Sequence, residues 1–249
     1  PQTLLLREQI TALPENGTVL ICPPADPYRC PPGPYERASL IASWLKQHKP
    51  KAKLLILDPK RSFSKQALFE QAWRHHYAYG SDNALIEWHS LADNPIKAID
   101  HKTSTVITEF GDRFRGDVIN LIPPQTAGRI AIDSGLTDSS GWCPIKPISS
   151  ASLLAPNIHV IGDAANYAPI PKSAFAANSE AKHCALTISL MLKDQDPIDP
   201  VWFNTCYSAV TADQAISVSN VYRLDSKQGL SQASIIGGVS SRTDADTLK

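Results

Sequence analysis

The sequence predicts an α/β fold around a parallel sheet, and three observations lead to this prediction. Residues 18–22 form a short apolar run bounded by turn residues, which is typical of a buried parallel strand. Residues 36–47 carry apolar side chains at helical spacing, and Pro34 suits the first helical turn. Residues 53–58 form a second apolar run that ends in Asp58. This order of elements is that of a Rossmann unit, in which such an acid holds a ribose.

The loop between the first strand and its helix departs from the Rossmann pattern. Residues 27–36 read Pro-Tyr-Arg-Cys-Pro-Pro-Gly-Pro-Tyr-Glu, without the glycine-rich fingerprint of a dinucleotide site. Prolines have no N–H to offer a pyrophosphate, so the loop is poorly equipped for a dinucleotide. It offers the thiol of Cys30 instead, which indicates a nucleotide-site scaffold with different chemistry.

The remaining elements follow the same plan. We expect further helices and strands, including a β-meander after Pro95 that ends at Pro123 and Pro124, because prolines cannot donate to a sheet ladder. The predicted segments are helices at 1–10, 66–76 and 176–193 and strands at 84–88, 103–110 and 117–122, followed by an apolar strand at 158–161 that runs into Gly162-Asp163.

Charge and motif content limit the classes of function. Lys+Arg and Asp+Glu number 24 each, so the formal charge of zero gives no electrostatic case for a nucleic-acid partner or an anionic membrane. No apolar stretch reaches bilayer-spanning length, so no membrane span is predicted. No Ser-His-Asp order or nucleophile elbow supports hydrolysis.

Four separated motifs resemble one family closely. They lie at residues 29–37, 120–125, 159–163 and 204–208. The family is the flavin-binding subunit of flavocytochrome c sulfide dehydrogenase, which is related to sulfide:quinone oxidoreductases within the disulfide-reductase flavoproteins. The resemblance implies a Rossmann-like FAD/NAD(P)-type two-domain flavoprotein fold with a β-meander excursion and a small C-terminal domain.

The resemblance also implies three regions. Residues 1–124 are expected to form a Rossmann-like middle domain with Cys30, residues 125–195 the C-terminal half of an FAD-binding domain, and residues 196–249 part of a C-terminal domain with Cys206. We expect the chain to be a fragment, incomplete at both ends. The preceding segment would carry the glycine-rich motif that holds the adenosine diphosphate of FAD.

The five cysteines have different expected roles. Cys30 and Cys206 match the redox-active pair of the family, which forms a disulfide beside the flavin ring. Cys143 and Cys184 are predicted to be free buried thiols, since a single Cys is usually a small apolar residue. Cys22 is also expected to be buried structure. Its weaker alternatives are a part in the redox site or a thiophilic metal such as copper, and no other metal site is predicted.

The resemblance assigns flavin contacts to residues 158–173. Gly162 would allow close backbone approach, and the Asp163 carboxylate would accept a hydrogen bond from a ribityl hydroxyl. The following helix would point its N-terminus at the flavin, where Lys172 and Ser173 would lie and favour negative charge on reduction. Glu36 is the candidate acid–base group, with an ordinary first-turn glutamate as the alternative.

The implied activity is oxidation of sulfide to zero-valent sulfur or polysulfide through a Cys30–Cys206 disulfide and FAD. Electrons would pass to a separate c-type cytochrome subunit that carries the haem, in the periplasm. Two alternatives stay open. A membrane-associated sulfide:quinone oxidoreductase requires an amphipathic C-terminal segment, whereas residues 231–249 are polar. A redox-inactive sulfur-binding scaffold is the second.

Overall fold

A four-stranded parallel sheet forms the first half of the protein. The computed structural model describes residues 1–225 and 229–234. The strand order is β3-β2-β1-β7, and every neighbouring pair is parallel. The strands are β1 (Thr18–Cys22), β2 (Lys53–Asp58), β3 (Ile86–Ser90) and β7 (Val118–Leu121). The predicted α/β class with a parallel sheet is therefore confirmed.

Strand β3 begins two residues later than the sequence predicts. The predicted strand starts at residue 84, but β3 starts at Ile86, where pairing with Leu54 begins. The N–H of Leu85 donates to the carbonyl of Tyr77 at 2.9 Å, at the end of the preceding helix, so only its carbonyl is bonded to β2, where it accepts from the N–H of Leu54 at 2.8 Å.

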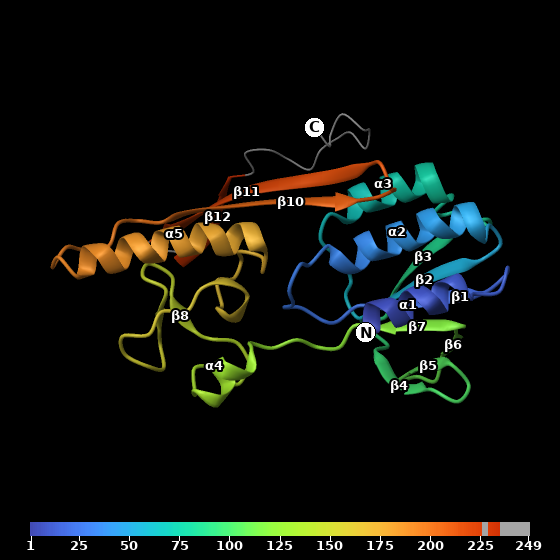
Figure 1. Cartoon of the computed structure of the whole chain (residues 1–249), viewed down its shortest axis with the longest axis horizontal. Coiled ribbons are helices and arrows are strands. Elements are labelled where there is room, and N and C mark those ends of the chain that lie inside the picture. Colours follow the sequence, from blue (N-terminus) through green and yellow to red (C-terminus); the bar gives the residue numbers. More distant parts are fainter. Residues whose placement is uncertain (226–228, 235–249) are drawn as a thin grey trace.

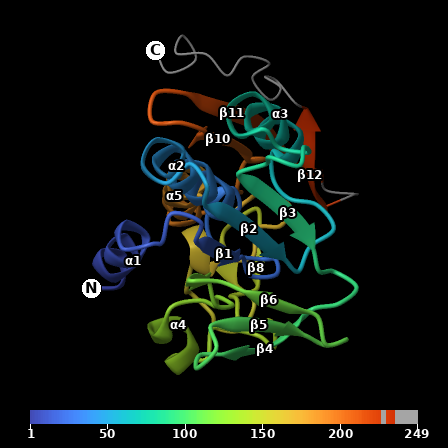
Figure 2. The ribbon, with the colours of Figure 1, turned by 90° about the vertical axis from the view of Figure 1, so that its right-hand side faces the viewer.

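Helices and a second sheet cover opposite faces of the parallel sheet (Figure 2). On one face, α2 (Gly33–His48) and α3 (Gln66–Tyr77) pack on Val19, Ile21, Leu54 and Ile56. On the other face, Leu20 and Leu57 pack against the antiparallel sheet of β4 (Ile96–Asp100), β5 (Thr105–Thr108) and β6 (Arg113–Arg115). This second sheet corresponds to the predicted β-meander, except that the strand expected at its end, 117–122, is β7 and pairs with β1 in the parallel sheet.

The middle of the chain contains little regular structure before a long helix. The elements are α4 (Arg129–Asp133), a hairpin of β8 (Ile145–Lys146) and β9 (Ala151–Ser152), a 3₁₀ turn (Gly162–Ala164), and α5 (Ala174–Met191). The prediction of a strand at 158–161 is wrong for the structure described. Within the described residues it pairs only through the isolated bridge Ala151–His159, and a strand needs a partner along its length.

An antiparallel sheet follows α5. It contains β10 (Val201–Ala209), β11 (Ala215–Asp225) and β12 (Gly229–Ser234), in that order. The long β10–β11 ribbon runs from α5 towards α3 (Figure 1). Its hairpin end contributes Val210 and Ile216 to the core of the first half, whereas Trp202 and Tyr222 belong to a second core with α5. The ribbon therefore joins the two halves.

The amino-terminal segment forms α1 (Gln2–Thr11), as predicted, and it lies beside α2 (Figure 2). The three region boundaries stay predictions, and residues 226–228 and 235–249 of the last region lie outside the described residues. Within the described ranges, no helix combines the length and apolar character needed to cross a bilayer.

Candidate functional site

The loop that carries Cys30 contacts three segments that are remote in sequence. The N–H of Cys30 donates to the carbonyl of Lys172 at 2.8 Å. The N–H of Arg29 donates to Gln125 Oε1 at 3.0 Å, and its Nε lies 3.0 Å from Asp163 Oδ2. These contacts bring the proline-rich loop, the segment after β7 and the Gly-Asp turn to one place.

The backbone of this loop is fixed around the thiol. Cys30 has a left-handed φ of 56°, and its carbonyl accepts from the N–H of Gly33 at 2.8 Å. A Cβ at Gly33 would lie 3.4 Å from Cys30 Sγ, so glycine keeps the space beside the sulfur open. The hydroxyl of Tyr28 donates to the carbonyl of Pro31 at 2.7 Å. The N–H groups of Arg29, Cys30 and Gly33 all donate to acceptors of the protein, which agrees with the prediction that the loop is poorly equipped for a pyrophosphate.

Asp58 stands where a Rossmann fold holds a ribose, but its carboxylate is already occupied. The residue is fully buried. It accepts from the hydroxyl of Tyr35 at 2.5 Å and from Trp88 Nε1 at 3.0 Å, and it pairs with Lys60 Nζ at 2.8 Å. The carboxylate therefore has a structural role. The sequence has an acid at the position that would bind a ribose, but its oxygens are bonded to side chains of the protein.

The thiols of Cys30 and Cys206 line one cavity of about 190 Å³, which we call the dithiol cavity. Cys30 comes from the loop after β1 and Cys206 from the middle of β10. All five cysteines are free thiols in the structure, so the predicted disulfide is not formed in it. The remaining lining residues are Pro31, Pro32, Ser64, Lys65, Pro169, Pro171, Ser173, Asn204, Val218, Asn220 and Tyr222.

The surroundings of Cys30 act on its acidity in both directions. Desolvation of the thiol raises its pKa, and negative charge on Cys206 and Glu36 does the same. The N–H of Gly33 and the ammonium of Lys65 act in the opposite direction. The charges and hydrogen bonds around Cys30 therefore determine how readily its thiol ionises.

Lys65 is a site residue that the sequence reasoning missed. It precedes α3, is buried, and donates from Nζ to the carbonyl of Cys206 at 2.7 Å and to Ser208 Oγ at 3.0 Å. No sequence motif marks it, because its partners lie more than 140 residues away. Only the tertiary fold brings this ammonium to the cysteines.

Glu36 lies in the first turn of α2, as predicted, and its carboxylate joins two elements. Its Oε1 accepts from the N–H of Ala209 at 2.7 Å, at the end of β10. The side chain is half-buried and close enough to Cys30 and Lys65 for their charges to interact. Glu36 therefore fastens the Cys206 strand to the helix that follows Cys30, and its part in proton transfer stays a prediction.

The Gly-Asp turn offers a buried acceptor. Gly162 has a φ of 70°, which favours glycine, and its N–H donates to Glu180 Oε2 at 2.7 Å. Asp163 Oδ1 is buried and has no hydrogen-bond partner within the described structure. A buried carboxylate oxygen is stable when it receives a donor, and a ribityl hydroxyl would supply one. These residues fit the predicted flavin contact.

Lys172 and Ser173 support this turn and the helix after it. Lys172 Nζ donates to the carbonyls of Asp163 and Ala165 at 2.7 and 2.8 Å, and it lies 3.8 Å from the ring centre of Trp142. Ser173 is the N-cap of α5, and its hydroxyl also donates to Asn204 Oδ1 at 2.5 Å. Both side chains bond to other residues of the site, and their direct contact with a cofactor stays a prediction.

The other three cysteines do not line the dithiol cavity. Cys22 is fully buried in an apolar cluster with Leu20 and Leu57, and burial raises the pKa of its thiol to about 12. A thiol at that pKa is a poor metal ligand, because metals bind the thiolate. The predicted burial of Cys143 and Cys184 is confirmed. No cluster of metal-binding side chains occurs in the part of the chain described.

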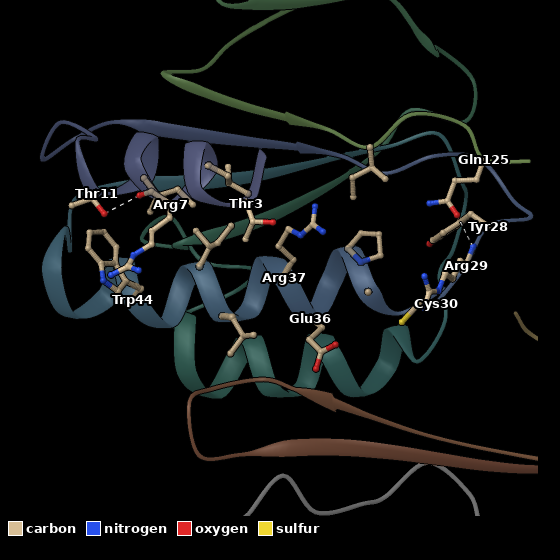
Figure 3. A pocket seen from close by; sticks show the side chains of 17 residues that line it. Thr3, Arg7, Thr11, Tyr28, Arg29, Cys30, Glu36, Arg37, Trp44 and Gln125 are labelled. Carbon is tan, nitrogen blue, oxygen red and sulfur yellow. Dashed lines mark hydrogen bonds between the residues drawn. The ribbon is translucent and has the colours of Figure 1, made fainter. Parts of the chain in front are cut away.

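A larger groove of about 960 Å³ runs between α1 and α2 and ends at Cys30 (Figure 3). Arg7, Arg37 and Trp44 line its length, whereas Tyr28, Arg29 and Gln125 gather at the Cys30 end. The thiol is therefore open to a groove on one side and to the dithiol cavity on the other.

Comparison with known families gives two matches. Residues 3–123 match the central part of the sulfide dehydrogenase [flavocytochrome c] flavoprotein chain, and residues 198–249 match the flavin-binding part of flavocytochrome c sulphide dehydrogenase. The chain belongs to this flavoprotein family. The resemblance predicted from the four motifs is thereby confirmed.

Solved structures support the fold. The chain is similar to the sulfide:quinone oxidoreductase of Aquifex aeolicus, with a TM-score of 0.67 at 16% identity over 88% of this chain and 54% of that one. It is also similar to a chain of the Tetrahymena thermophila mitochondrial ATP synthase, with a TM-score of 0.63 at 16% identity over 86% and 52%. It therefore spans about half of the length of each neighbour. The predicted flavoprotein-type fold is confirmed.

Proposed function

We propose that this chain is part of the flavoprotein subunit of a periplasmic sulfide dehydrogenase. The subunit would bind FAD, oxidise sulfide to zero-valent sulfur or polysulfide, and deliver electrons to a c-type cytochrome subunit that carries the haem. One observation carries the proposal: the thiols of Cys30 and Cys206 share a cavity, and the Cys30 loop contacts the Gly-Asp turn through the Arg29–Asp163 ion pair. Two cysteines beside a flavin-type turn provide a sulfur-based redox site.

The sulfur chemistry starts from an oxidised Cys30–Cys206 pair. Hydrosulfide attacks one of the two sulfurs, forms a new S–S bond and gives a cysteine persulfide. The bond between the two cysteines breaks, and the other cysteine leaves as a thiolate. When the two cysteines bond again, the outer sulfur of the persulfide leaves as zero-valent sulfur or in a polysulfide, and FAD, when bound, would supply the acceptor for the two electrons released.

The residues around the pair support this reaction in distinct ways. Glu36 lies beside Cys30 and takes the proton of hydrogen sulfide or of a cysteine thiol. Asp163 holds a ribityl hydroxyl through its free Oδ1, while Lys172 fixes the backbone of that turn. The Asp163–Arg29 pair keeps the turn next to the cysteine loop.

The proposal is tested with the full-length subunit and its cytochrome partner. Cys30→Ser and Cys206→Ser should each abolish sulfide-dependent cytochrome reduction while the flavin absorbance stays unchanged. Cys184→Ser is the matched control, because this buried cysteine of α5 lies outside the dithiol cavity. Turnover that survives in both active-site variants would overturn the disulfide mechanism.

A second measurement identifies the electron acceptor. The proposal predicts that a c-type cytochrome accepts electrons from the sulfide-reduced protein far faster than a soluble quinone analogue does. The reverse order would favour the sulfide:quinone oxidoreductase alternative. The C-terminal segment that this alternative requires, residues 231–249, lies outside the described structure from residue 235 onward.

A further inference from the structure

Lys65 holds an ammonium group inside the protein next to both cysteines. Only 9% of the residue is exposed, and it occupies a left-handed backbone position with a φ of 63° before α3. Its Nζ donates to the carbonyl of Cys206 at 2.7 Å and to Ser208 Oγ at 3.0 Å, so the group is directed at the Cys206 strand. Burying an ammonium is costly unless negative charge or hydrogen bonds compensate for the lost water.

The negative charge that could compensate comes from the reacting groups. Among the described residues that line the dithiol cavity, Lys65 is the only Lys, Arg, Asp or Glu. The groups that interact with it are Cys206 on β10, Cys30 on its loop and Glu36 on α2. Burial lowers the pKa of Lys65, while interactions with Cys206, Glu36 and Cys30 act to raise it. The ammonium and the cysteine sulfurs therefore stabilise each other when a sulfur is ionised.

Opening the cysteine pair creates the charge that Lys65 faces. Attack by hydrosulfide releases one cysteine as a thiolate and leaves the other as a persulfide, which also ionises. Prolines and β-strand side chains wall the cavity, so a thiolate that faces it is surrounded by less water than in bulk solvent. An ammonium already held in place meets this charge without reorganisation.

We propose that Lys65 is a positioning residue that orients Cys206 through its carbonyl and stabilises the thiolate and persulfide formed when the pair opens. The role of this stabilisation in sulfide oxidation rests on the proposed function. The stabilisation of an ionised sulfur by Lys65 can be measured without sulfide turnover.

The test compares three variants of the reduced full-length subunit. Lys65→Met removes the charge and the donors at similar length, Lys65→Gln keeps donors without charge, and Lys65→Arg keeps the charge. None of them changes the cost of the left-handed backbone position, since all are L-residues with a Cβ. Lys53→Met is the matched control: its ammonium also donates to a backbone carbonyl, that of Ala84, but at the opposite end of β2.

The readout is the pH dependence of iodoacetamide alkylation at each cysteine, followed by mass spectrometry. We expect Lys65→Met and Lys65→Gln to slow alkylation of Cys30 or Cys206 at pH 7 about tenfold, as a rise of about one unit in the thiol pKa does. Lys65→Arg should restore most of the rate, and Lys53→Met should match the wild type.

The outcomes separate this inference from the proposed function. Wild-type alkylation profiles in Lys65→Gln would overturn the charge role, and full reactivity in Lys65→Met would overturn the whole inference, even if sulfide turnover is intact. If Lys65→Met does not fold, the alkylation profile of Lys65→Gln tests the inference in its place. If the charge dependence is found but the wild-type protein oxidises no sulfide, the proposed function fails while the role of Lys65 stands.

Discussion

Glu36 has two separable roles, and two substitutions distinguish them. Its Oε1 accepts from the N–H of Ala209 at 2.7 Å, which fastens the end of β10 to α2. Glu36→Gln keeps an amide oxygen in that place but removes the charge and the ability to carry a proton. Glu36→Ala removes the acceptor as well, so it breaks the contact and leaves the Ala209 N–H unpaired.

The magnitudes follow from this geometry. A hydrogen bond to a charged group contributes about 1.5–3 kcal/mol, so Glu36→Ala should lower the free energy of unfolding by about 2 kcal/mol. With a urea m-value of about 2 kcal/mol/M, the unfolding midpoint falls by about 1 M. Glu36→Gln should cost less than about 1 kcal/mol. Both variants should lower kcat/KM for sulfide by about 100-fold, as expected for loss of a general acid–base group.

The assays are urea unfolding followed by tryptophan fluorescence and sulfide-dependent reduction of cytochrome by the full-length enzyme. Glu70→Gln on α3 is the control, because its carboxylate contacts Gln66 and Arg74 of its own helix. A wild-type kcat/KM in Glu36→Gln would refute the proton-transfer role and leave only the structural contact with Ala209. An unchanged free energy of unfolding in Glu36→Ala would refute that structural role.

Three further predictions concern the supports of the site. Asp58→Asn leaves the nearly buried Lys60 ammonium without its counter-ion, so urea unfolding should show a loss of about 3–5 kcal/mol; a loss below about 1 kcal/mol would contradict the structural role. Burial raises the pKa of Glu180, so the wild type should lose stability as the pH rises from the ordinary value of 4.5 through the raised pKa. Glu180→Gln should lack that loss. If the free energy of unfolding of the variant falls between pH 4 and 7 as much as that of the wild type, the raised pKa of Glu180 is not the cause. Lys172→Met removes two bonds to the Gly-Asp turn, so FAD affinity of the full-length subunit should fall at least tenfold in a fluorescence titration; unchanged affinity would show that the turn holds without it.

Much of the fold follows from local patterns in the sequence. The parallel strands are short apolar runs, and α2 follows from Pro34 and buried positions at helical spacing. The segment at 158–161 has the same apolar character, but it forms only an isolated bridge because it pairs with another segment at His159 alone. Local composition indicates a preference for strand, whereas an actual strand also depends on a partner elsewhere in the chain.

The candidate site shows the same division. Cys30, Cys206 and Asp163 carry motif signals, and the structure brings their segments together. Lys65 carries no signal, since its importance comes from burial next to β10. Asp58 carries a misleading one, because Tyr35 and Lys60 occupy the carboxylate that the Rossmann pattern assigns to a ribose. Residue type can be read from sequence, but the partners of a charged group are set by tertiary structure.

The most direct test of the proposed mechanism is the covalent state of Cys30 and Cys206 before and after sulfide. Oxidised full-length subunit is alkylated and mapped by mass spectrometry, with and without one equivalent of sulfide under anaerobic conditions. The mechanism predicts a Cys30–Cys206 disulfide, or a sulfur-bridged form of it, that sulfide converts into a persulfide on one cysteine and an alkylatable thiol on the other. A sulfide-oxidising protein in which Cys30 is paired with Cys22, or in which both cysteines stay free throughout, would contradict it.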